Sequence, residues 1–281
     1  MAELPEGTVE LVERALAEDI GGGDVTSEAT VPEEAGATGR ISLKEPGVVY
    51  GLEVAREVFR QAGVNGFEAL AGEGQWLDSI PVEVAVVEGP ARAILAGERT
   101  ALNLLGHLSG VATTTARFVK AIEGSGARVL DTRKTTPGLR NLEKAAVEAG
   151  GGENHRFGLY DAILIKENHI VMAGGVAEAV SACREVNPGL GVEIEAETIE
   201  QVEQAIEAGA DRILLDNMDL DGLAVAVAAR DGSDGARPLL EASGGIDLES
   251  AGAIASTGVD FLSIGSLTHS TPALDFSLLL D

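Results

Sequence analysis

The hydrophobic pattern of the chain changes near residue 127, where irregular spacing gives way to short apolar runs that alternate with helix-sized segments. These apolar runs lie at residues 128–131, 161–165, 191–195, 212–216, 238–242 and 260–264. Parallel strands that helices cover on both faces have continuous apolar sequences of this kind. The pattern therefore predicts six βα units in a barrel-like parallel sheet, fewer than the usual eight.

The first third of the chain has no steady βα rhythm. Apolar spacing predicts helices at about residues 8–19, 52–61 and 97–122, and strand-like runs lie at 39–43 and 81–87. This mixture is typical of a small α+β domain. The glycines at 21–23 are interpreted as a turn, because no strand precedes them as it would in a phosphate-binding loop.

Composition excludes several kinds of partner. The net charge of −26 repels polyanions, and an aromatic content of 3% leaves few side chains for base stacking, so we expect no nucleic-acid partner. No apolar run reaches the roughly 18 residues that a membrane span needs, and residues 1–6 lack the features of a secretion signal. We expect a cytoplasmic protein that does not bind membranes.

Two further features of the composition concern stability. Acidic residues number 46 against 20 basic ones, which leads to the hypothesis that the protein is adapted to high salt, where ions screen charge repulsion. The single cysteine, Cys183, excludes an internal disulfide and a cysteine metal cluster. We interpret Cys183 as a small buried apolar residue.

Positive charge is concentrated in one segment. Residues 131–169 contain six cations and six acids, so this segment is neutral within a strongly acidic chain. Three of the five lysines lie in it. Such a concentration indicates a binding site for an anionic ligand.

The ends of the predicted strands carry the candidate site residues. In a parallel barrel the chemistry lies at the carboxyl ends of the strands. The residues at or just beyond these ends are Thr132, Arg133, Lys134, Lys166, Glu195, Asp216, Ser243, Gly244, Gly245, Ile264, Gly265 and Ser266. Any one of them alone is more simply a helix cap, a turn or a surface charge, but the whole set indicates a site.

His155 is a further candidate, although a lone histidine is usually structural. It follows the glycines at 150–152, which let the backbone turn tightly and approach a ligand, and its neighbours are Asn154 and Arg156. We expect His155 to orient the pocket rather than to transfer a proton.

Three stretches, at residues 18–27, 97–113 and 131–169, resemble in order and spacing the sequences of quinolinate phosphoribosyltransferases. The resemblance covers nearly the whole chain. It implies an N-terminal α+β sandwich domain at residues 1–110 and an incomplete α/β barrel of six or seven strands at 111–268, with the tail at 269–281 completing the first domain.

The resemblance also implies an activity and an assembly. Members of the family join quinolinate to phosphoribosyl pyrophosphate and release pyrophosphate and carbon dioxide, which yields nicotinate mononucleotide for NAD biosynthesis. They form homodimers, or hexamers, in which the N-terminal domain of one subunit closes the barrel of another. Mg²⁺ is the implied cofactor.

Matched position by position, the cationic quinolinate pocket consists of Arg133, His155, Arg156 and Lys166, with Arg99 supplied by the other subunit. Lys134, Glu195 and Asp216 face the ribose, pyrophosphate and Mg²⁺, and the metal would be held by Glu195 and Asp216. The expected catalytic residues are Lys134, Lys166, Glu195 and Asp216. Thr132 and the two strand-end segments at 243–245 and 264–266 complete the substrate site, where backbone N–H groups bind the 5′-phosphate.

These roles agree with the chemistry of the residues. An arginine fork grips a carboxylate with two parallel hydrogen bonds, and a lysine adds a compact charge, which suits a ring with two adjacent carboxylates. Carboxylates hold Mg²⁺ and stabilise the positive charge that develops on the ribose as pyrophosphate leaves. Glu193 shares a strand face with Glu195 and is a possible helper.

Three alternatives remain open at the level of the sequence. A member of the same family acting on another aromatic acid would share the ribose and phosphate residues, but the complete cationic set argues against it. A Schiff-base lyase would use Lys166 as nucleophile and would need that lysine deprotonated. A noncatalytic phosphate-binding barrel would bind its ligand without releasing pyrophosphate.

Overall fold

The chain forms two compact units in a computed structural model that describes residues 4–281 except 234 and 236. Unit 1 consists of Met1–Ala116, Thr135–Gly151 and Ser266–Asp281, and unit 2 of Arg117–Lys134 and Gly152–Gly265. Residues 1–3, which belong to the segment inspected for a secretion signal, lie outside the described part. No helix within that part is both long enough and apolar enough to cross a bilayer.

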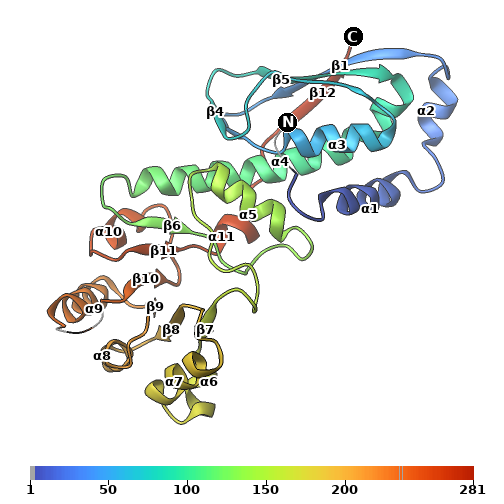
Figure 1. Cartoon of the computed structure of the whole chain (residues 1–281). Helices are drawn as coiled ribbons and strands as arrows, with labels where there is room; N and C mark the ends of the chain where they lie inside the picture. The colour runs from blue at the N-terminus through green and yellow to red at the C-terminus, as the bar shows by residue number, and fades with distance from the viewer. Residues whose placement is uncertain (1–3, 234, 236) are drawn as a thin grey trace. The chain divides into compact units, whose positions relative to one another are not determined.

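Unit 1 contains a four-stranded antiparallel sheet (Figure 1). Its order is β12 (Phe276–Leu280), β1 (Gly36–Leu43), β5 (Val82–Pro90) and β3 (Gly66–Ala69). In β1, Ile41 and Leu43 are buried while Arg40 and Ser42 are only half-buried, as the two-residue period of a strand requires. The last strand of the chain therefore belongs to the same sheet as the first.

Helices and a two-stranded ribbon complete the unit. The elements are α1 (Thr8–Ile20), α2 (Val25–Thr30), α3 (Leu52–Ala62), α4 (Ala91–Ala121), α5 (Arg140–Ala149), α11 (Ser266–His269), and the ribbon of β2 (Gly47–Val49) with β4 (Gln75–Leu77). Helix α4 touches the backbone of the chain's final segment. A Cβ on Gly110 would lie 2.1 Å from the carbonyl oxygen of Pro272, so only glycine permits this approach.

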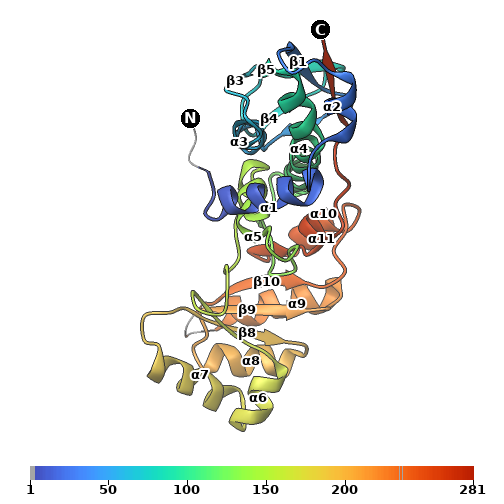
Figure 2. The same ribbon diagram turned by 90° about the vertical axis from the view of Figure 1, so that its right-hand side faces the viewer.

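Unit 2 is built on a six-stranded parallel sheet. Its order is β6 (Arg128–Leu130), β11 (Phe261–Ser263), β10 (Leu239–Ser243), β9 (Arg212–Asp216), β8 (Val192–Ala196) and β7 (Ile163–Ile165). The helices of the unit are α6 (Glu167–Ala173), α7 (Val176–Val186), α8 (Ile199–Glu207), α9 (Leu220–Gly232) and α10 (Ala251–Ala255). Figure 2 shows α7, α8 and α9 beside the strands that they connect.

The parallel sheet is open, because β6 and β7 are its two edges in the described chain. The segment at residues 152–162 begins beyond β6, where Glu153 forms a single parallel bridge to Leu130, and ends at β7. This segment carries His155 and Arg156.

The expected fold class is confirmed, and each of the six predicted apolar runs contains a strand of the parallel sheet. Helix α4 begins at Ala91, six residues before the predicted start at 97, because Pro90 ends β5 and the helix follows directly. The interpretation of Cys183 as a buried residue is wrong, since it is only half-buried on α7.

Candidate active site

A cavity of about 600 Å³ lies in unit 2 at the carboxyl ends of the parallel strands. Lys166 follows β7, Glu195 lies in β8, Asp216 ends β9 and Ser243 ends β10, so the strand register brings side chains from distant parts of the sequence together. The predicted site residues that line this cavity are Thr132, Arg133, Lys134, His155, Arg156, Lys166, Glu195, Asp216, Ser243, Gly244 and Gly245.

Two guanidinium groups give the cavity a cationic part. Arg156 Nη1 donates to the carbonyl oxygen of Ala162 at 3.2 Å, while its buried Nε has no hydrogen-bond partner within the described residues. Burial, and next the charge of Arg133, hold the pKa of Arg156 below its usual value. The carboxylates of Glu193 and Asp161 oppose this effect. The planar forks of two neighbouring guanidinium groups suit this part of the cavity to an anion.

Lys166 and Glu195 form an ion pair in the same cavity, with 2.5 Å between Nζ and Oε2. Lys166 is the N-cap residue of α6, and its side chain is half-exposed. This environment differs from the buried, unpaired setting that makes a lysine nucleophilic.

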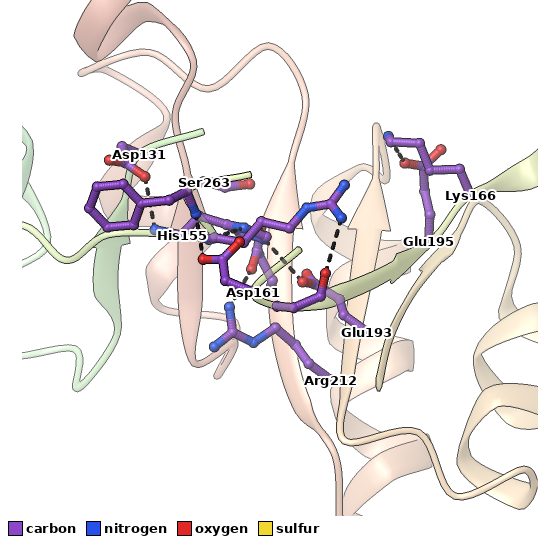
Figure 3. Close-up of polar contacts among 12 residues, drawn as sticks. Asp131, His155, Asp161, Lys166, Glu193, Glu195, Arg212 and Ser263 are labelled. Atoms are coloured by element: carbon purple, nitrogen blue, oxygen red, sulfur yellow. Dashed lines mark hydrogen bonds and ion pairs between the residues drawn. The ribbon is translucent and has the colours of Figure 1, made fainter. Parts of the chain in front are cut away.

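His155 is fixed on every side by the protein (Figure 3). Its backbone N–H donates to Asp131 at 2.8 Å, its Nδ1 accepts from the backbone N–H of Arg156 at 2.7 Å, and its Nε2 lies 3.0 Å from Glu193 Oε2. Burial lowers the pKa of His155, but the hydrogen bond to Glu193 and the charge of Glu241 outweigh burial and raise it above the usual value. In the neutral ring, acceptance at Nδ1 puts the proton on Nε2.

This tautomer limits what His155 can do. His155, Glu193 and Glu241 bring possible ligand atoms within 4.8 Å of one another, the spacing of a metal site. A protonated Nε2 has no lone pair for a metal, however, and both ring nitrogens are already engaged by the protein. Within the described residues His155 is thus held in one orientation, and the orienting role expected from the sequence stays a prediction.

A layer of charged residues lies below His155 in the sheet. Glu241 in β10 is completely buried, and its Oε2 accepts from Arg212 in β9 at 3.0 Å. The guanidinium carbons of Arg212 and Arg128 lie 4.3 and 4.2 Å from the centre of the Phe261 ring. Burial, and next the charge of Glu193, raise the pKa of Glu241 to about 7.

A second cluster of side chains, made of three carboxylates, offers oxygen ligands for a metal. Glu195, Glu197 and Asp216 place one oxygen each within 4.8 Å of the others, and none of these residues is fully buried. Mg²⁺ prefers oxygen ligands and keeps several waters, so a half-exposed set of carboxylates at the cavity fits this ion. Glu197 was not among the predicted metal ligands.

Four predicted residues do not line the cavity. Arg99 is exposed on α4 in unit 1, and Ser266 begins α11 in the same unit. Ile264 is buried, with its backbone N–H donating to Leu130 O at 2.9 Å, and Gly265 follows it at the end of unit 2. None of the residues predicted at 264–266 lines the cavity, although Ser263, where β11 ends, does.

Comparison with known proteins identifies the family. Residues 24–109 match the N-terminal domain of quinolinate phosphoribosyl transferase, and residues 111–279 match its C-terminal domain. The chain belongs to the quinolinate phosphoribosyltransferase family. Among the relatives of this family is the nicotinate-nucleotide pyrophosphorylase [carboxylating] of Mycobacterium leprae, which is 44% identical over 95% of each chain.

Further relatives agree with this membership. The probable nicotinate-nucleotide pyrophosphorylase [carboxylating] of Bacillus subtilis is 43% identical over 95% of this chain and 91% of its own. The structure of the nicotinate-nucleotide pyrophosphorylase from Francisella tularensis matches with a TM-score of 0.93 and 40% identity, over 99% of this chain and 98% of that chain. The quinolinate phosphoribosyltransferase fold thus extends over both units.

Five residues of the cavity wall were not predicted from the sequence: Leu164, Leu214, Asn217, Glu241 and Ser263. Glu241 carried a detectable signal, because it is a charged residue inside the apolar run at 238–242. Asn217 carried a weaker one, as the residue that directly follows Asp216. The two leucines resemble core residues in the sequence, and nothing local marks them as cavity wall.

Proposed function

We propose that this member of the quinolinate phosphoribosyltransferase family converts quinolinate and phosphoribosyl pyrophosphate into nicotinate mononucleotide, pyrophosphate and carbon dioxide. The enzyme is then a decarboxylating pentosyltransferase of NAD biosynthesis. One observation carries the proposal: guanidinium groups lie in the same cavity as the carboxylates of Glu195 and Asp216. A doubly negative ring and a developing ribose cation need these opposite charges side by side.

The cationic residues bind and orient the ring. Arg133 and Arg156 grip the two carboxylates with their planar forks, and Lys166 adds a point charge once the ligand competes with Glu195 for its ammonium group. His155 holds the backbone of Arg156 in place through Nδ1. The ring nitrogen is thereby presented to C1 of the ribose, and positioning supplies much of the rate.

The carboxylates act on the sugar. Glu195 and Asp216 stabilise the positive charge that develops at C1 and the ring oxygen as the bond to pyrophosphate breaks. With Glu197, these residues would hold Mg²⁺, which when bound neutralises charge on the leaving pyrophosphate. Lys134 pairs with the phosphates, and the backbone at Gly244 and Gly245, both at positive φ, lies open for the 5′-phosphate.

Loss of carbon dioxide follows from the product of this step. The new bond joins the ring nitrogen to C1 and leaves the nitrogen positively charged. The bond between C2 and its carboxylate then breaks, and its electron pair stays on C2, where the adjacent cationic nitrogen stabilises it. A proton taken up at C2 completes the conversion to nicotinate mononucleotide.

A homodimer with shared sites is part of the proposal. Arg99 is exposed on α4, and the cavity of unit 2 is complete in every other predicted quinolinate contact. Arg99 of one subunit would add a further cation to the site of the other. We also propose a cytoplasmic location for this enzyme, as expected for the synthesis of a soluble nucleotide.

The test is a reaction with quinolinate, phosphoribosyl pyrophosphate and Mg²⁺ in which carbon dioxide and the mononucleotide are followed together. Equal amounts of both products are expected. Nicotinate in place of quinolinate is the matched control, because it lacks the carboxylate that is lost. Equal turnover of nicotinate, or mononucleotide without carbon dioxide, would contradict the proposal.

A Schiff-base lyase is the alternative from another enzyme class. The ion pair with Glu195 and the half-exposed position of Lys166 argue against it. Borohydride treatment in the presence of a carbonyl substrate should leave the mass of the protein unchanged, whereas a stable adduct on Lys166 would favour the lyase.

A further inference from the structure

Asn217, the residue after Asp216, is the only residue other than glycine with a positive φ in the described chain, at 55°. A left-handed backbone is strained for most residues, and asparagine tolerates it better than most. Glycine would adopt it without strain. A side chain kept at such a position, on the wall of the cavity, points to a role for that side chain.

The contacts of Asn217 indicate what the role is. Its Nδ2 donates to Asp216 Oδ2 at 2.7 Å, and its backbone N–H donates to the carbonyl oxygen of Ser243 at 2.8 Å. The first bond fixes the direction of the Asp216 carboxylate, and the second ties the end of β9 to the end of β10. Asn217 thus connects two strand ends that both carry site residues.

Gly244 shows that the amide of Asn217 occupies a defined place. A Cβ on Gly244 would lie 2.1 Å from Asn217 Oδ1 and 2.6 Å from its Cγ, and Gly244 has a φ of +100°. Any side chain at position 244 would displace the asparagine from its bond to Asp216. The absence of a side chain at Gly244 therefore leaves room for the Asn217 amide in the place where it donates to Asp216.

From these contacts we propose that Asn217 is a positioning residue: its amide, seated on Gly244, holds the Asp216 carboxylate in the direction needed to face the ribose and pyrophosphate. This inference rests on the proposed function for the identity of the ligand, but the contact between the two side chains does not. Asn217 acts through Asp216 and does not contact the ring of quinolinate.

The first experiment compares Asn217→Gly and Asn217→Asp. Glycine keeps the left-handed backbone without an amide, and aspartate keeps the shape of the side chain without the donor. Both variants should lower kcat roughly tenfold, the effect of losing one hydrogen bond to a charged group, and raise the KM for phosphoribosyl pyrophosphate. The Kd for quinolinate alone, measured by calorimetry, should not change.

Two controls separate positioning from folding. Asn187→Gly makes the same substitution at the C-cap of α7, outside the cavity, and should leave kcat, KM and the midpoint of thermal unfolding unchanged. The unfolding midpoint of each Asn217 variant should stay near that of the wild type. Wild-type kcat in Asn217→Gly overturns the proposal, and so does a loss confined to Asn217→Asp, which would indicate charge repulsion instead.

The second experiment asks whether Asn217 acts through Asp216. Calorimetry with phosphoribosyl pyrophosphate and Mg²⁺ should show weaker binding in Asn217→Gly, but no further weakening when the same change is added to Asp216→Asn. An equal effect on both backgrounds overturns the proposal. A wild type that binds this ligand yet forms no product contradicts the proposed function alone, because the binding cycle still tests the coupling of the two residues.

Discussion

Individual residues in the cavity are held by the protein before any ligand is bound. His155 uses both ring nitrogens within the protein, Asn217 is strained but satisfied, and Lys166 is paired with Glu195. Arg156 differs, because its buried Nε has no hydrogen-bond partner among the described residues. An unsatisfied donor of this kind is costly, and a ligand that satisfies it gains affinity.

The arginine is therefore the residue whose loss should affect quinolinate binding most directly. We expect Arg156→Ala to lower kcat/KM for quinolinate roughly 10- to 100-fold, the range for losing a hydrogen bond between charged groups. Steady-state kinetics measure this, with Arg237→Ala as control, since Arg237 forms an exposed ion pair with Asp231. An unchanged kcat/KM in Arg156→Ala would remove this residue from the quinolinate pocket.

The sequence identified those residues whose chemistry is visible from type and position, such as Lys166, Glu195 and Asp216 after apolar runs. It could not identify the contact of His155 Nε2, because its partner Glu193 lies 38 positions further along the chain. The position of Asn217 on the cavity wall follows from a backbone angle that no periodicity encodes. Contacts across strands are thus the part that sequence patterns leave out.

At the scale of elements, the sequence pattern predicted the strands that have continuous apolar sequences. It did not predict short strands, or a strand whose partner lies far away along the chain. The runs that became β6 to β11 are buried in a sheet whose order the βα alternation implies. Strand β4 is mostly exposed, and β12 pairs with β1 more than 200 residues earlier, so neither has a local pattern. Their formation depends on partners that only the folded chain supplies.

Strand β10 should give the protein a distinctive dependence on pH. The folded-state pKa of Glu241 is about 7, raised from 4.5, so the folded state binds more protons than the unfolded state between these values. Stability should therefore fall as pH rises from about 4.5 to 7, by on the order of 3 kcal/mol from this group. Urea unfolding across this range measures the change.

Glu241→Gln is the comparison for this effect. Glutamine does not ionise, so the variant should lack this part of the decrease, while its carbonyl oxygen can still accept from Arg212. The unfolding free energy of the wild type, measured relative to that of the variant, should therefore decrease as pH rises towards 7. A constant difference from pH 4.5 to 7 would contradict the raised pKa.

Helix α4 should be sensitive at its closest contact with the C-terminal segment. Gly110→Ala places a Cβ against the carbonyl oxygen of Pro272, and we expect it to lower the free energy of unfolding by about 1–3 kcal/mol, as overpacking does. Gly232→Ala, in α9, is the control, because the described residues place no atom within 4 Å of the added Cβ. Equal stability of both variants in chemical denaturation would contradict the close packing of α4.

At the scale of the whole molecule, charge should determine how stability responds to salt. A net charge of −26 repels itself in dilute buffer, and the Debye length shortens from about 30 Å at 0.01 M to about 3 Å at 1 M salt. The midpoint of thermal unfolding should therefore rise with potassium chloride. Sodium chloride is the control for a specific effect of potassium, and a midpoint independent of both salts would contradict the hypothesis of adaptation to high salt.

The proposed dimer makes a prediction that involves two copies of the chain. In the proposed dimer, Arg99→Ala removes the cation that a subunit contributes to the site of its partner. Lys166→Ala disables the site in the subunit's own unit 2. Each variant alone should be nearly inactive, but mixing them after subunit exchange should restore part of the activity, because some sites then have both residues intact. Each variant carried alone through the same exchange procedure is the control, and an absence of recovery in the mixture would place Arg99 outside the partner's site.

The open edge of the parallel sheet has a consequence for how such an enzyme can change. The segment at residues 152–162 connects the region beyond β6 to the start of β7 and contributes His155 and Arg156 to the cavity wall. Among the described residues, its pairing with the sheet is the bridge at Glu153. Substitutions or insertions in this segment would change which aromatic substrate the cavity binds, while the hydrogen bonds between the strands of the sheet remain intact. The preference for a substrate can therefore change in this fold through changes in one short segment outside the hydrogen-bonded strands.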